Sequence, residues 1–83
     1  MRISHAEAIR RARRLYLLIA DAPERERVNA ATLSARTGWT KKCVRHYLDL
    51  MRVAYGVRLC YYAGQYTWRI ESVPDGVDAL IRE

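Results

Sequence analysis

Six residues on one face of a predicted helix are the best candidates for chemistry in this sequence. At 100° per residue, the polar side chains of residues 41–51 fall on one side of the helix and the apolar side chains on the other. The polar side carries permanent cations, so it suits contact with a polyanion such as the phosphates of a nucleic acid. The candidate residues, including the helix cap, are Thr40, Lys41, Lys42, Arg45, His46 and Asp49.

The distribution of charge favours a polyanion partner. The 83 residues include 15 Lys and Arg against 9 Asp and Glu, a formal net charge of +6. Residues 1–52 hold 12 basic and 5 acidic residues, a net +7, whereas residues 53–83 hold 3 and 4, a net −1. The excess therefore lies before residue 53, where Arg10, Arg13 and Arg14 form a second basic cluster. A solvated, arginine-rich surface without a ligand is the alternative interpretation.

Patterns typical of catalysis and of metal binding are missing from the sequence. Cys43 and His46 are three residues apart, but Cys60 is the only other cysteine and His5 the only other histidine. We find no Ser–His–Asp set, no glycine-rich phosphate loop and no carboxylate pair in a predicted cleft. We therefore expect no enzyme activity, no cofactor, no metal and two reduced cysteines.

The first predicted element is a helix near the N-terminus. Ser4 and Glu7 have the spacing of a capping box, and the helix they begin extends to about residue 22, before Pro23. A charged loop follows, and Val28 is expected in a short strand of its own.

Two further helices surround a glycine. Asn29 is a good cap for a helix over residues 30–37, which Gly38 ends in a left-handed conformation. Thr40 then caps the helix over residues 41–51. Two short helices separated by a glycine turn have the spacing of a helix-turn-helix.

Alternating apolar residues then predict a β-hairpin with a four-residue loop at 62–65. The expected cross-strand pairs are Tyr61 with Tyr66, Leu59 with Trp68, and Val57 with Ile70. This register puts all six apolar side chains on one buried face. On the outer face Arg58 lies opposite Arg69, and the two guanidinium groups either hold a phosphate between them or stay solvated.

The C-terminal residues 74–83 are predicted to form a fourth short helix, because Val77, Leu80 and Ile81 follow helical spacing. This helix would either cover Leu17 and Leu18 of the first helix or contact a second copy of the chain.

This order of elements resembles the winged helix-turn-helix DNA-binding domains of bacterial regulators of the DeoR-like and biotin-repressor-like kind. The resemblance covers about residues 5–71 and departs from the family at Ser34, where Ala is usual, and at Thr37, where an aliphatic residue is usual. The other matching positions are Leu33, Gly38, Trp39, Val44 and Tyr47. It implies an α+β fold, mainly α, with a three-helix core, a two-stranded hairpin as wing and a short C-terminal helix. All of these lie in a single domain of residues 1–83, with the core at 4–71 and the tail at 72–83.

The resemblance also implies sequence-specific binding of double-stranded DNA by a small bacterial or phage transcriptional regulator, with a homodimer on a two-fold site. The helix over 41–51 would enter the major groove, where Arg45 and Lys42 would contact base edges. Thr40 and Lys41 would contact phosphates. The remaining contacts would come from His46 and Asp49 and, on the hairpin, from Arg58, Tyr62, Gln65 and Arg69.

Two other functions fit the sequence. Winged helices also serve as protein-interaction modules, for example as a phage-encoded inhibitor of a host protein or nucleoprotein complex. RNA binding is also open, because Tyr61, Tyr62 and Tyr66 would suit stacking on unpaired bases, although Tyr61 and Tyr66 are expected in the core. No apolar run approaches the roughly 18 residues of a membrane span, and residues 1–5 do not begin a signal peptide, so we expect a cytoplasmic protein.

Overall fold

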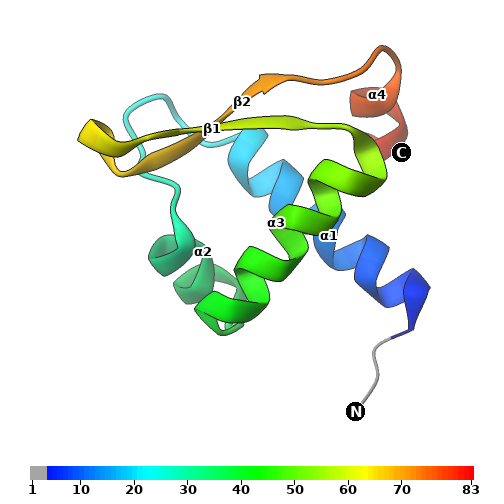
Figure 1. Ribbon diagram of the computed structural model, residues 1–83, viewed down its shortest axis with the longest axis horizontal. Coiled ribbons are helices and arrows are strands. Elements are labelled where there is room, and N and C mark those ends of the chain that lie inside the picture. The colour runs from blue at the N-terminus through cyan, green and yellow to red at the C-terminus, as the bar shows by residue number, and fades with distance from the viewer. Residues whose placement is uncertain (1–3) are drawn as a thin grey trace.

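The computed structural model describes residues 4–83, which form four helices and a two-stranded antiparallel sheet (Figure 1). The helices are α1 (His5–Ala20), α2 (Ala30–Thr37), α3 (Lys41–Tyr55) and α4 (Val77–Arg82). The strands are β1 (Arg58–Tyr62) and β2 (Thr67–Ser72), joined through a short 3-10 turn at Ala63–Gln65. The fold is therefore α+β and mainly helical, as predicted. None of the helices in the described part of the chain is long and apolar enough to cross a membrane.

The helix starts lie where the capping residues predicted them. The side chains of Ser4, Asn29 and Thr40 each accept a hydrogen bond from the backbone N–H three residues later, at 3.0 to 3.1 Å. Each bond pairs an N–H group that the first turn of a helix leaves without a partner. Gly38 ends α2 with a φ of 78°, a left-handed conformation that glycine adopts without steric cost.

Two helix ends differ from the prediction. Helix α1 stops at Ala20, about two residues early, and Asp21 is its C-cap. Helix α3 continues to Tyr55, one turn beyond residue 51, because no residue before Gly56 interrupts it. Gly56 then ends the helix with a φ of 66°. The longer α3 carries the chain to the base of the hairpin.

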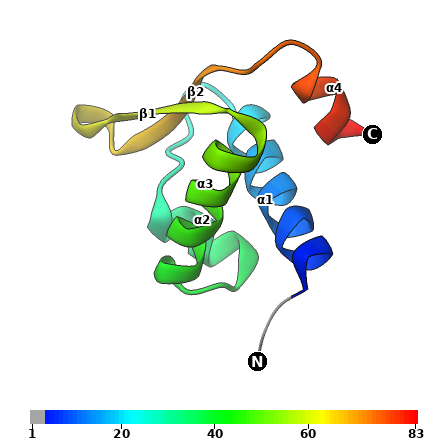
Figure 2. The same cartoon turned by 45° about the vertical axis from the view of Figure 1, so that its right-hand side comes forward.

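The core lies where α1 crosses α3, with α2, the hairpin and α4 closing its edges (Figure 2). The side of α3 that is buried is the apolar side of the predicted helix, so its polar side faces outward. The buried hydrophobic residues are Ala12, Leu15, Tyr16, Ile19, Val28, Leu33, Val44, Tyr47, Leu48, Met51, Val57 and Ile81.

The predicted hairpin register is wrong by two residues. Leu59 pairs with Ile70, Cys60 with Arg69, and Tyr61 with Trp68. The loop has the expected four residues, but it occupies 63–66 instead of 62–65. A shift of two residues leaves each side chain on the face that was predicted for it, because the direction of side chains repeats every two residues along a strand.

Residue 28 explains this register. The Val28 N–H donates to Thr67 Oγ1 at 2.8 Å, and the Trp68 N–H donates to the Val28 carbonyl at 2.7 Å. These bonds tie the start of β2 to the chain just before α2, and Thr67 is buried as a result. Val28 does not form a strand of its own, contrary to expectation, but it binds the backbone of β2.

Two consequences of the predicted register are also wrong. The six apolar side chains do not share one buried face, because Tyr61 is 42% and Tyr66 59% exposed. Arg58 does not lie opposite Arg69; it pairs with Ser72 next to an irregularity in the ladder. The hairpin therefore does not place these two arginines on either side of one phosphate.

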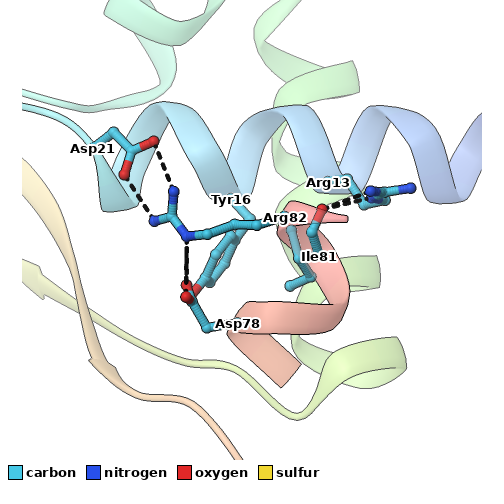
Figure 3. A network of polar contacts seen from close by, with 6 residues as sticks. All are labelled: Arg13, Tyr16, Asp21, Asp78, Ile81 and Arg82. Atoms are coloured by element: carbon cyan, nitrogen blue, oxygen red, sulfur yellow. Dashed lines mark hydrogen bonds and ion pairs between the residues drawn. The ribbon is translucent and has the colours of Figure 1, made fainter. Parts of the chain in front are cut away.

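The C-terminal helix docks on α1 through polar contacts (Figure 3). Arg82 donates to both carboxylate oxygens of Asp21, at 2.8 and 3.2 Å, and to Asp78 within α4. The Tyr16 hydroxyl donates to Asp78 Oδ1 at 2.6 Å, and Arg13 donates to the Ile81 carbonyl. The side chain of Ile81 completes the hydrophobic core.

The expectation that α4 covers Leu17 and Leu18 is wrong. Both leucines line an open groove of about 430 Å³ beside the loop that follows α1, and no residue of α4 contributes to its walls. The tail instead packs on the neighbouring side of α1, where Tyr16 and Arg13 hold it.

Candidate nucleic-acid interface

The polar face of α3 is open to solvent along its whole length. All six candidate residues from Thr40 to Asp49 are exposed, and their helix is packed from behind by Val44, Tyr47 and Leu48. A rigid helix therefore presents flexible polar side chains outward. This arrangement suits contact with a ligand that approaches from outside the core.

Three cations at the start of this face are not neutralised by the protein. Within the described residues, no carboxylate lies within 4.0 Å of the charged nitrogens of Lys41, Lys42 or Arg45. They occupy the first turns of α3, where the helix dipole adds further positive potential. An anion bound here would not have to displace an internal partner.

The remaining two polar residues of α3 have neighbours on the helix itself. Asp49 faces Arg52 at 3.7 Å, an exposed ion pair one turn apart. The His46 ring packs edge-on against Tyr47, with 5.2 Å between ring centroids. Asp49, the one carboxylate among the candidate residues, is therefore paired with Arg52 and does not neutralise the cations of the first turns.

The hairpin and the start of α2 form a groove beside two of the free cations. Lys41 and Arg45 line it from α3, and Tyr61 and Tyr66 line it from the hairpin. Its volume is about 400 Å³. The sequence placed the cations on one helix face, but only the tertiary structure brings them to the tyrosines.

The other face of the hairpin is turned away from α3. Tyr62, Gln65 and Arg69 line a separate hollow with the loop of residues 24–27. Arg69 donates hydrogen bonds to the backbone carbonyls of Glu24 and Glu26, so it fastens this loop to β2. The structure therefore divides the four predicted hairpin contacts between different surfaces.

Arg58, the fourth predicted hairpin residue, lies at the base of β1. It is exposed, and within residues 4–83 no carboxylate pairs with it. The strand separates it from the loop, so Arg58 and Gln65 lie at opposite ends of the hairpin. The two residues do not form a local cluster.

The basic cluster of α1 is largely used within the protein. Arg13 donates to the carbonyls of Ile81 and Glu83, and Arg10 pairs with Glu7 at 3.1 Å. Arg14 lies over the Trp39 ring at 5.6 Å. These arginines hold elements together, which leaves the start of α3 as the stronger candidate surface.

Sequence reasoning missed the exposed tyrosines of the groove. Tyr61 and Tyr66 were expected in the core because they fit the apolar alternation. Tyr66 instead lies in the loop with a φ of 52°, and its carbonyl accepts a hydrogen bond from the side-chain amide of Asn29. Tyr66 lies just before β2, and alternation does not distinguish such a residue from one inside the strand.

A scan against protein-family models, a search of curated proteins and a search of solved structures found no match to this chain. Function is therefore inferred from the geometry of the site.

Proposed function

We propose that this protein binds double-stranded DNA as a winged helix-turn-helix, with the N-terminal half of α3 in the major groove. The observation that carries the proposal is a group of three cations, Lys41, Lys42 and Arg45, on the outward face of a helix packed on the core. Among residues 4–83 none of the three has a carboxylate partner. An unpaired cation releases counterions from DNA when it meets a phosphate, which favours binding.

The charged residues of the polar face of α3 have different roles in this proposal. Arg45 and Lys42 donate to base edges, with Arg45 suited to the O6 and N7 atoms of guanine. Thr40, the neighbouring backbone amides and Lys41 hold phosphates at the helix N-terminus. Asp49 keeps Arg52 in place and does not contact the DNA.

The hairpin acts as the wing in this proposal. Gln65 and Tyr62 near its loop reach the DNA backbone, and Arg58 supplies a further cation at its base. Arg69 is removed from the set of DNA contacts because its guanidinium already binds two backbone carbonyls. A homodimer on a two-fold site would supply the contact area that a single small domain lacks, as expected for a bacterial or phage transcriptional regulator.

The test is selection of duplexes from a random pool, followed by affinity measurements over a range of salt concentrations. The logarithm of the association constant should fall linearly with the logarithm of salt concentration, with a slope of about −0.9 for each phosphate neutralised. Affinity that does not change between low and moderate salt would contradict the proposal.

A protein-interaction module is the second candidate, and one observation favours it. The groove that contains Leu17 and Leu18 beside Pro23 is open and partly apolar, as protein-binding grooves are. This candidate predicts that random duplex DNA fails to bind while affinity capture recovers a single protein. The duplex experiment therefore separates the two candidates.

A further inference from the structure

The groove between α2, α3 and the hairpin combines aromatic rings with free cations. Its walls are Ala30 at the start of α2, Lys41 and Arg45 on α3, and Tyr61, Tyr66 and Trp68 on the hairpin. A volume of about 400 Å³ lies within the range of small-ligand sites in proteins. The groove is open along one side, so a chain can enter it without the fold opening.

Two of its rings are accessible for stacking. Tyr66 is 59% exposed and Tyr61 is 42% exposed. Trp68, the third large aromatic residue of the groove, is partly buried. The Tyr61 and Trp68 rings contact each other at 5.0 Å between centroids and are tilted by 58°. Trp68 thus supports the Tyr61 ring and holds it at the groove.

The cations of the groove stand beside these rings. Lys41 and Arg45 have no carboxylate partner within the described residues. Arg27, which lines the separate hollow beside Tyr62, lies 5.8 Å from the centroid of the Tyr66 ring. Aromatic faces next to unpaired cations are the combination that binds unpaired nucleotides, with the base on the ring and the phosphate at the cation. A paired base offers no free face of this kind.

Hydrogen bonds hold the groove open in one shape. The Asn29 side-chain amide donates to the Tyr66 carbonyl at 2.8 Å, and Val28 makes two short hydrogen bonds to Thr67 and Trp68. These bonds join residues 66–68 to the chain at the start of α2, and Tyr61 pairs with Trp68 in the sheet, so little ordering is required when a ligand binds.

We propose that this groove binds an unpaired deoxynucleotide, and that the protein prefers a duplex with a single-stranded extension to the same duplex with blunt ends. The proposal rests on the proposed function, because the duplex occupies the polar face of α3. Lys41 and Arg45 border both surfaces, so a strand that leaves the duplex meets the groove directly.

The test compares four DNA ligands that share one duplex, by fluorescence anisotropy at constant salt. The duplex ends blunt, with a short deoxythymidine extension, with an abasic extension of the same length, or with a ribonucleotide extension. The deoxythymidine extension should strengthen binding roughly 5-fold or more, the lower end of what one stacked base contributes. The abasic extension should give little of this gain, because it adds phosphates without bases.

Two variants assign the gain to the groove. Tyr66→Asn removes the ring and keeps a residue that tolerates positive φ, so the preference for the extension should disappear. Tyr62→Ala removes a ring that is 47% exposed from the opposite face of the hairpin. Because Tyr62 is a proposed backbone contact, both affinities should fall, and the ratio of extended to blunt affinity should persist. Loss of the ratio in Tyr62→Ala and not in Tyr66→Asn would overturn the assignment.

Other outcomes are equally decisive. Equal gains from the deoxythymidine and abasic extensions would show that added phosphates alone bind, and tighter binding of the ribonucleotide extension would assign the groove to RNA. Either result overturns this inference while salt-dependent binding of the blunt duplex leaves the proposed function intact. Binding of extensions without any binding of the blunt duplex would overturn the proposed function instead.

Discussion

The side-chain amide of Asn29 donates a 2.8 Å hydrogen bond to the backbone carbonyl of Tyr66. The same side chain caps α2 through its oxygen, which accepts from the Thr32 N–H at 3.0 Å. One residue therefore fastens the hairpin loop to the start of α2.

The two roles of Asn29 can be separated by substitution. Asn29→Asp keeps the capping oxygen and loses the donor to Tyr66, so the free energy of unfolding should fall by about 1 kcal/mol. Hydrogen exchange of the hairpin amides should accelerate while that of α2 should not. Asn29→Ala loses both bonds and should also destabilise α2. Unchanged exchange in the hairpin of Asn29→Asp would contradict this role.

Removal of Arg45 should weaken DNA binding in a sequence-dependent way. We expect Arg45→Ala to cost about 1 to 3 kcal/mol of binding free energy and to relax the selected sequence at one position. Arg25→Ala is the matched control, because it removes the same charge from an exposed residue of the loop between α1 and α2. Competition binding with selected and random duplexes measures both. Equal effects of the two variants would mean that Arg45 contributes charge alone.

The turn between α2 and α3 should require glycine. Gly38 has a φ of 78°, so Gly38→Ala should lower the free energy of unfolding by about 1 kcal/mol. No atom of the described part of the chain lies within 4 Å of the added Cβ, so the cost comes from the backbone conformation. Gly64→Ala is the control, since Gly64 has equally open space and no positive φ. Urea unfolding should show destabilisation in the first variant only.

The contact between Tyr16 and α4 predicts a loss of stability at high pH. Burial and the hydrogen bond to Asp78 raise the pKa of Tyr16 to about 12, from an ordinary value of 10.0. Because the folded state holds this proton more tightly, its contribution is complete below pH 10 and is lost as the pH rises through 12. The loss should reach about 3 kcal/mol. In Tyr16→Phe, unfolding midpoints should decline less over this interval; an equal decline would contradict the assignment.

The same network predicts a loss of stability in acid. The hydrogen bond from Arg82 lowers the pKa of Asp21, and the hydrogen bond from Tyr16, with a further one from Arg82, lowers that of Asp78. Their contribution is therefore present above the ordinary value of 3.8 and is lost as the pH falls through the lowered values. Thermal unfolding followed below about pH 4 should show this loss, and Arg82→Gln should reduce it. If Arg82→Gln lost stability in acid to the same extent as the parent protein, the Arg82 contacts would be excluded as the cause of that loss.

Most of the helical framework was predictable because its signals are local. Ser4, Asn29 and Thr40 each bond to an amide three residues away, and Gly38 needs only its own conformational freedom. The ends were less predictable: α1 stops at Ala20, before the break that Pro23 imposes, and no breaker stands near residue 51, so α3 continues to Tyr55. Local bonds thus explain why the helix starts were predicted more closely than the helix ends.

The candidate site was also predictable only in part from the sequence. The sequence alone determined that Lys41, Lys42 and Arg45 share one polar helix face, because that follows from 100° per residue. Only the tertiary structure decided that Tyr66 lies in an exposed loop and that Arg69 binds a neighbouring loop. Alternation repeats every two residues, so two hairpin registers fit it equally well. Hydrogen bonds between residues that are about 40 positions apart in the chain distinguish them, and no local pattern records such bonds.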